Sequence, residues 1–139
     1  MRILSQIKFP ARIEYFKTFM DFVSSCARKQ GFSQKRISEI ELATEEALIN
    51  IFNYAYEGNN GDVEIVCKLD NRKFILEIAD SGVPFDVLSV KDPDISADIS
   101  ARQIGGLGVF LMKKLVDSIQ YRYDGKKNIL SLIVFRDNG

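Results

Sequence analysis

Histidine is missing from all 139 residues of the chain. This removes the commonest general base of enzymes, the commonest nitrogen ligand of metal ions, and the phospho-acceptor of autophosphorylating signalling kinases. Any chemistry at this protein's site must therefore use carboxylates, amides, hydroxyls or backbone groups.

An excess of charge of either sign is also missing. The chain holds 19 lysines and arginines and 19 aspartates and glutamates. Without a net charge, nothing global attracts nucleic acid or an anionic membrane, and neither is expected as a partner. A local basic cluster is explained more simply as a solvated helix end followed by a hairpin; it comprises Lys113, Lys114, Arg122, Lys126 and Lys127.

Cysteines are few, and long hydrophobic runs are absent. Cys26 and Cys67 lie outside any CxxC spacing, so we expect free, mostly buried thiols in a reducing cytosol. The N-terminus lacks the apolar segment of a signal peptide, and no window has the roughly 20 apolar residues of a membrane span. The sequence thus predicts a soluble, cytoplasmic protein.

What is present is the composition of one globular domain, with 46% hydrophobic and 27% charged residues. Ser33 is expected to cap a helix and Gly31 to end the one before it. Hairpin turns are expected at Asp70-Asn71 and around Gly125. Periodicity predicts strands at 2–9, 63–70, 72–80, 118–124 and 128–136, and helices at 11–30, 34–56 and 105–117.

This order of elements predicts an α+β two-layer sandwich. Strands that follow one another in hairpins, with helices in a pair, do not fit a βαβ repeat. The polar segment 81–104 has no clean period, and an irregular connection of this length in a small domain is usually functional or mobile.

The second predicted helix carries an unexpected row of polar side chains. In "EEALINIFNYAY", residues 45–56, Glu46, Asn50 and Asn53 fall within about 60° of one another. A solvent-facing strip would explain them, but asparagine is a poor residue inside a helix. A carboxylate one turn from an amide also suits a hydrated divalent ion or a nucleophilic hydroxyl. The apolar stripe opposite comprises Ile40, Ala47, Leu48, Ile51 and Ala55.

Two further stretches carry residues suited to a ligand. In "DSGVPFD", residues 80–86, Asp80 ends a strand and Gly82 follows two residues later. These residues are typical of a simple turn. The Asp80 carboxylate, beside a glycine that permits close approach, could also accept a hydrogen bond from an exocyclic amine. "GGLG", residues 105–108, opens a helix, where backbone N–H groups form an anion site or simply a flexible turn. It fits neither the Rossmann fingerprint nor the Walker P-loop.

Taken in order, these stretches resemble the ATP-binding fold shared by histidine kinases, gyrase B subunits and mismatch-repair ATPases. Over nearly its whole length the chain resembles most closely the small bacterial anti-sigma factor serine/threonine kinases. "EEALINIFNYAY" is similar to that family's N-box, "DSGVPFD" to its first glycine box and "IGGLGVFLMKKLVD" to its second. The resemblance implies a single ATP-binding domain over residues 1–139, with a mixed, mostly antiparallel sheet covered by helices on one face.

The resemblance also implies roles for individual residues. Glu46 matches the general base that deprotonates the attacking hydroxyl, and Asn50 matches the Mg²⁺ ligand. Asp80 matches the carboxylate that accepts from the adenine amino group, and Gly82 the residue that lets the ring approach. The loop that cradles the phosphates matches Gly105, Gly106, Leu107, Gly108 and Val109.

Other matches lie at the edges of this pattern. Ser131, on the last strand, stands where the family usually has a threonine near adenine, and residues 85–104 match a mobile lid over the nucleotide. Arg102 is a candidate for reaching the γ-phosphate. Tyr54 stands where many relatives carry a histidine, and the consequence of this difference does not follow from the sequence.

The resemblance implies an ATP- and Mg²⁺-dependent protein-serine kinase that acts in partner switching, as a homodimer. It would bind a sigma factor or equivalent target, and phosphorylate an anti-sigma factor antagonist protein. A sequestering module that binds nucleotide without phosphotransfer is the alternative, although it would not need Glu46. Plain ATP hydrolysis and a domain that binds no nucleotide are further alternatives.

Overall fold

The computed structural model describes residues 1–56, 58–89 and 106–136. Its strands are β1 (Arg2–Pro10), β2 (Asp62–Asp70), β3 (Lys73–Asp80), β4 (Ser118–Asp124) and β5 (Lys127–Phe135). Its α-helices are α1 (Phe16–Lys29), α2 (Gln34–Asn50) and α3 (Gly106–Leu115), and its short helices are η1 (Ile13–Tyr15), η2 (Ile51–Ala55) and η3 (Val87–Ser89). This order confirms the predicted α+β arrangement.

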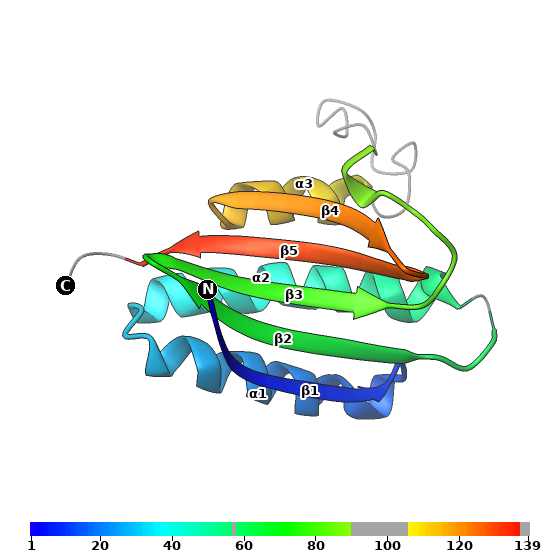
Figure 1. The fold of residues 1–139 in the computed structure, drawn as a ribbon, viewed down its shortest axis with the longest axis horizontal. Coiled ribbons are helices and arrows are strands. Elements are labelled where there is room, and N and C mark those ends of the chain that lie inside the picture. Colours follow the sequence, from blue (N-terminus) through cyan, green and yellow to red (C-terminus); the bar gives the residue numbers. More distant parts are fainter. Residues whose placement is uncertain (57, 90–105, 137–139) are drawn as a thin grey trace.

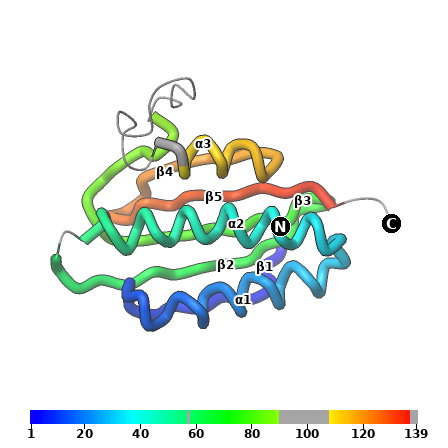
Figure 2. Tube along the Cα trace, turned by 180° about the vertical axis from the view of Figure 1, so that it is seen from behind, coloured from blue at the N-terminus to red at the C-terminus, as the bar shows by residue number. Residues whose placement is uncertain are grey.

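One five-stranded sheet runs in the order β1-β2-β3-β5-β4, and the three α-helices lie on one of its faces (Figures 1 and 2). Every neighbouring pair of these strands is antiparallel. The expectation of a mixed sheet was therefore wrong for the described strands. The reason is that β3 and β4, which run in the same direction, are not neighbours. Strand β5 lies between them and runs in the opposite direction.

Alternation along the strands builds the core, because successive side chains point to opposite faces of a sheet. The inward side chains of the three central strands are buried against the helices; they are Val63, Ile65 and Cys67 of β2, Phe74, Leu76 and Ile78 of β3, and Leu130, Leu132 and Val134 of β5. The helices complete the core with Phe19, Val23, Ile40, Leu48 and Met112. The predicted alternation of β2 and β3 is thereby confirmed.

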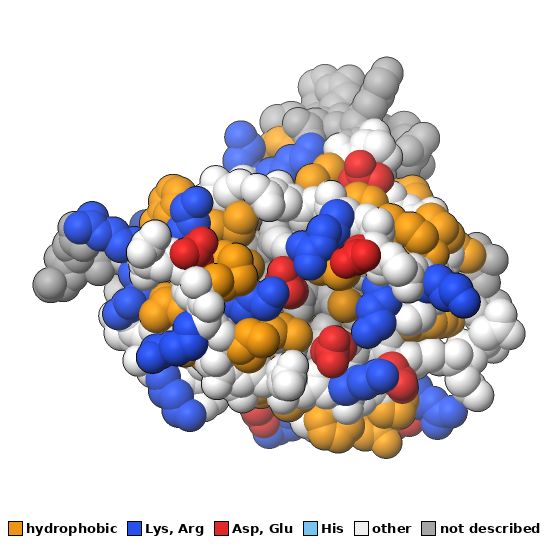
Figure 3. All heavy atoms as spheres, in the orientation of Figure 1, with side chains coloured by type: hydrophobic (Ala, Val, Ile, Leu, Met, Phe, Trp, Pro, Cys, Tyr) orange, Lys and Arg blue, Asp and Glu red, His pale blue; other side chains and the backbone are white. Residues whose placement is uncertain are grey.

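The opposite face of the sheet is uncovered by the described helices (Figure 3). Lysine and arginine side chains alternate there with acids. Glu77 pairs with Lys68 at 2.7 Å and with Arg122 at 3.4 Å. This mixture of both signs is typical of a surface strand face.

Local signals in the sequence fix several ends and turns. The backbone N–H of Arg36 donates to Ser33 Oγ at 3.1 Å, which confirms the predicted cap of α2. Gly31 follows α1 with φ +80°, a conformation that glycine adopts without strain. The first hairpin turn falls on Asn71 and Arg72, one residue later than predicted, with Asn71 at φ +56°.

The second predicted helix does not continue as an α-helix to residue 56. The α-helix α2 ends at Asn50, and a π-helix, η2, follows to Ala55. A π-turn adds a residue to the turn and is frequent at functional sites. The end of η2 lies against Gly82 and Val83, just after β3, where the candidate site lies.

Candidate functional site

A cavity of about 340 Å³ opens between the helices and the end of β3. Its volume falls within the range of small-molecule sites, and its lining is mainly apolar with a few polar groups, as such sites require. The lining residues are Ala47 and Asn50 of α2; Ile51, Tyr54 and Ala55 of η2; Ile78 and Asp80 of β3; Val83, Pro84, Phe85 and Val87; Val109 and Met112 of α3; Tyr121 of β4; and Asn128 and Leu130 of β5.

Among the described residues of this lining, Asp80 supplies the one carboxylate, and only 7% of it is exposed. Its Oδ1 accepts from the Gly82 backbone N–H at 2.9 Å and from Asn128 Nδ2 at 3.0 Å. Burial raises the pKa of Asp80, and these two hydrogen bonds partly oppose that effect. Because both donors reach Oδ1, Oδ2 accepts no hydrogen bond from the described residues and is available to a donor such as an exocyclic amine.

Asn128 is a buried polar residue of this site that the sequence interpretation missed, as it missed Tyr121. It is paired with Asp80 across β3 and β5 and is buried. Besides its bond to Asp80, its Nδ2 donates to the Val83 carbonyl at 3.0 Å. Its Oδ1 accepts from the Phe85 N–H at 3.1 Å and from the Tyr121 hydroxyl. Asn128 therefore fixes both Asp80 and the backbone that follows it.

Ser131 does not lie in this cavity, so the prediction that its hydroxyl lies near the base is corrected. The residue is buried, but it pairs with Glu77 on the other face of the sheet. An offset of three residues along a strand reverses the face to which a side chain points. The antiparallel register places Asn128, not Ser131, opposite Asp80.

Gly82 lies directly against the end of η2. A Cβ atom on Gly82 would overlap the backbone carbonyl of Ala55, so no other residue fits without a shift. The next residue, Val83, donates its N–H to the same Ala55 carbonyl at 3.1 Å. Gly82 was predicted to let the adenine ring approach. The structure gives a second, structural role to its missing side chain, which is to let the loop after β3 approach the end of η2.

Glu46 and Asn50 lie one turn apart on α2, towards α3. Asn50 lines the cavity. Glu46 lies against the first turn of α3, where a Cβ on Gly108 would come within 2.5 Å of Glu46 Oε2. Burial, and secondly the charge of Glu45, raise the pKa of Glu46. A carboxylate with a raised pKa, close to a helix N-terminus, is suited to accept a proton.

The glycine-rich segment is described from Gly106 onward. Gly106, Leu107 and Gly108 form the first turn of α3, whose initial backbone N–H groups have no partner within the helix, and Val109 is buried in the cavity wall. Gly105, Arg102 and most of the predicted lid, residues 90–104, lie outside the described residues.

Tyr54 stands at the edge of the cavity, one turn beyond Asn50, and is 47% exposed. Val83 and Phe85 flank the same opening and are 48% and 54% exposed. Apolar and aromatic side chains so exposed around a cavity are suited to contact a bound ligand.

The donor set for a metal ion is small. Over residues 1–56, 58–89 and 106–136, no group of three or more Cys, Asp or Glu side chains could hold a metal ion. The amide oxygen of Asn50, the predicted Mg²⁺ ligand, fits an ion that brings most of its ligands with it, as Mg²⁺ bound to nucleotide phosphates does. None of the described helices has the length and apolar character needed to cross a membrane.

This architecture is that of the ATP-binding fold to which the three sequence boxes pointed. A family model described as a histidine kinase-like ATPase domain matches residues 9–134. Among similar proteins, the serine-protein kinase RsbW of Bacillus thuringiensis (strain Al Hakam) is 31% identical over 129 residues, which cover 90% of this chain and 81% of that protein. The protein of the same name from Bacillus anthracis is 30% identical over the same coverage. The chain belongs to the histidine kinase-like ATPase family.

Proposed function

We propose that this chain is an ATP-dependent protein-serine kinase that regulates transcription by partner switching. It holds a sigma factor or an equivalent target in one state, and in the other it phosphorylates a serine of a small anti-sigma factor antagonist protein. The family and the relatives named serine-protein kinases support this proposal. The observation that carries it is the position of Glu46, beside the first turn of α3 and one turn from Asn50.

The base of the nucleotide occupies the apolar cavity. Asp80 Oδ2 accepts from the adenine amino group, while Asn128 and Gly82 hold Oδ1 in place. The surrounding apolar side chains, among them Met112 and Leu130, exclude water from this end of the site. The phosphates then extend towards α2 and the start of α3, where backbone N–H groups without a partner inside the helix favour negative charge.

At the other end, Glu46 removes the proton from the serine hydroxyl. The serine oxygen then forms its bond to the γ-phosphorus, the bond from that phosphorus to the ADP oxygen breaks, and the proton stays on Glu46. Asn50 offers its amide oxygen to Mg²⁺, which neutralises charge on the phosphates when bound. Most of the rate enhancement comes from positioning and charge neutralisation.

The proposed partners follow from the family resemblance. They are an antagonist protein as substrate, a sigma factor or equivalent as target, and a second copy of this chain in a homodimer, all in the cytoplasm. The uncovered face of the sheet is available for the homodimer (Figure 3). Static light scattering of the purified chain measures this oligomeric state.

Transfer of labelled phosphate tests the proposal. The purified chain is incubated with Mg²⁺ and γ-labelled ATP, with and without candidate antagonist proteins encoded by the same genome. We expect label on a serine of one candidate, and a loss of at least 100-fold in Glu46→Gln, since a general base contributes roughly 10²–10⁴. Glu14→Gln, at an exposed position on η1, is the control and keeps its activity, because η1 contributes nothing to the cavity lining.

Binding and stability measurements complete this experiment. Glu46→Gln should still bind ATP, since the base end of the cavity is unchanged. The raised pKa means that ionised Glu46 is unfavourable in the folded chain at neutral pH, so the glutamine variant should be at least as stable. Tight ATP binding without transfer to any candidate would instead indicate a sequestering module, and no ATP binding would overturn the proposal.

A further inference from the structure

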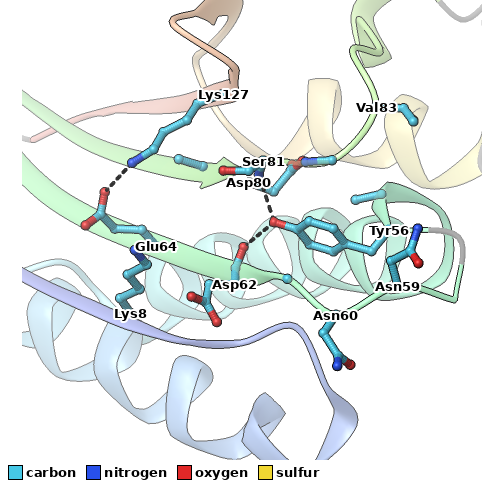
Figure 4. A pocket seen from close by; sticks show the side chains of 14 residues that line it. Lys8, Tyr56, Asn59, Asn60, Asp62, Glu64, Asp80, Ser81, Val83 and Lys127 are labelled. Atoms are coloured by element: carbon cyan, nitrogen blue, oxygen red, sulfur yellow. Dashed lines mark hydrogen bonds and ion pairs between the residues drawn. The ribbon is translucent and has the colours of Figure 1, made fainter.

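A second cavity, of about 590 Å³, opens at the same end of the sheet as the nucleotide cavity (Figure 4). Strands β1, β2, β3 and β5 and the loop after η2 contribute to its lining. The two cavities share Ala55, Asp80 and Val83 as lining residues. The segment from Asp80 to Val83 therefore lies between the second cavity and the nucleotide cavity.

Three successive backbone N–H groups in this wall each have a different partner. The N–H of Ser81 donates to the Tyr56 hydroxyl at 2.7 Å, and the N–H of Gly82 donates to Asp80 Oδ1 at 2.9 Å. The N–H of Val83 donates to the Ala55 carbonyl at 3.1 Å. Two of these partners, Ala55 and Tyr56, are neighbours at the end of η2. The end of this helix therefore determines the course of the backbone from Ser81 to Val83.

Tyr56 is itself held through its hydroxyl and along one edge of its ring. Its hydroxyl donates to the Asp62 carbonyl at 2.6 Å while it accepts from Ser81, so both of its hydrogen-bonding roles are used (Figure 4). Its ring packs against Gly61, where a Cβ atom would overlap the ring. The hydroxyl therefore connects the beginning of β2 to the segment that follows β3.

We propose that Tyr56 is a positioning residue for the nucleotide: its hydroxyl holds Ser81–Val83 against η2, and thereby aims Asp80 Oδ2 into the nucleotide cavity. Tyr56 is absent from the lining of that cavity and acts through the backbone of Ser81. This inference rests on the proposed function, because it assigns the residue to ATP binding. It concerns recognition of the base, and it leaves the proton transfer by Glu46 unaffected.

Tyr56→Phe is the direct test, since it keeps the ring on Gly61 and removes only the hydroxyl. We expect the dissociation constant and KM for ATP to rise about tenfold, which corresponds to about 1.4 kcal/mol. The kcat should change less than twofold, because the groups around Glu46 are unchanged. The preference for ATP over GTP should fall, because that preference depends on a correctly aimed carboxylate. Tyr123→Phe is the matched control: this tyrosine is 47% exposed and lies outside both cavity linings.

A second variant and a second readout keep the test decisive. Gly61→Ala displaces the ring instead of removing the hydroxyl, and should also weaken ATP binding. In Tyr56→Phe, amide hydrogen exchange should accelerate at Ser81 more than at Gly82, whose partner is unchanged.

The possible outcomes separate the two proposals. If the unaltered chain binds ATP and Tyr56→Phe binds it equally well with the same preference over GTP, the inference is wrong and the proposed function stands. If the apparent kcat falls in proportion to a loss of folded protein while KM and the dissociation constant for ATP stay the same, Tyr56 is merely structural and the inference is wrong. If the unaltered chain binds no ATP, both proposals fail.

Discussion

At the scale of single residues, burial and a neighbouring charge both act on Glu46, the proposed general base. Its pKa is raised first by burial and then by Glu45. A base must be ionised to act, so the rate of phosphotransfer should rise with pH through this raised pKa. The midpoint should therefore lie above the ordinary glutamate value of 4.5.

Glu45→Gln provides the test of this assignment. Removing the negative charge beside Glu46 makes ionisation easier, so the rising limb of the pH–rate profile should move to lower pH. Single-turnover transfer of labelled phosphate at a series of pH values measures the midpoint. Glu14→Gln, on the exposed segment η1, is the control and should leave it unchanged. An unshifted midpoint in Glu45→Gln would mean that another group limits the rate.

Residues whose positions depend on local periodicity could be predicted from the sequence. Helical spacing placed Glu46 and Asn50 on one face, and the end of a strand placed Asp80. In the structure Asn50 and Asp80 line the cavity of about 340 Å³, whereas Glu46 lies outside its lining, beside Gly108 of α3. Asn128 and Ser131 could not be distinguished in this way. Which of them meets Asp80 depends on the register between β3 and β5, and pairing partners this far apart leave no local signal.

At the scale of elements, Arg36 holds the start of α2 to the end of α3. Its Nη1 donates to the Leu115 carbonyl at 2.8 Å, and its Nη2 pairs with Asp117 Oδ2 at 2.6 Å. The same Asp117 oxygen accepts from the Phe135 N–H at 2.7 Å. One guanidinium thus connects the two helices that carry Glu46 and Gly108 at their other ends.

Arg36→Lys should separate these contacts, since a lysine cannot reproduce the planar fork of donors. We expect the free energy of unfolding to fall by about 1–2 kcal/mol, a modest amount because the ion pairs are partly exposed. Urea denaturation measures the change. Arg28→Lys, an exposed position on α1, serves as the control. Equal midpoints and slopes for both variants would show that Arg36 contributes nothing measurable.

The elements themselves were largely predictable, and the π-helix was not. Alternation, the Ser33 cap and the glycine turns are local signals, and they located the strands and helices correctly. The apolar periodicity of α2 continues into η2 without a break, so the sequence predicted one long helix. The end of η2 contacts a loop that is distant in the sequence, through the hydrogen bond from the Val83 N–H to the Ala55 carbonyl. Local periodicity carries no signal of such a contact, so the π-helix could not be predicted.

At the scale of the whole molecule, both cysteines lie inside the single core, as predicted from their number and spacing. Cys26 of α1 and Cys67 of β2 are free and buried. The neighbouring Cys26 and burial raise the pKa of the Cys67 thiol, which lowers its reactivity.

Thiol labelling should therefore report on global unfolding. We expect Ellman's reagent to modify Cys67 slowly at pH 8 in the native chain, and both cysteines rapidly in urea. The rate in native buffer should decrease further when ATP is added, because a bound ligand stabilises the folded state. Cys26→Ser assigns the signal to Cys67; rapid labelling of this variant without denaturant would contradict the burial of the core.

The internal position of β5 has a consequence for how the protein is made. Asn128 follows Asp80 by 48 residues, so at roughly 5–20 residues per second a ribosome adds it about 2–10 seconds later. During this interval β3 lacks its neighbour, and its hydrophobic edge is open to wrong partners. The sheet and the end of the cavity that Asp80 and Asn128 line are therefore completed together, and under the proposed function a nascent chain cannot bind nucleotide before its sheet is complete.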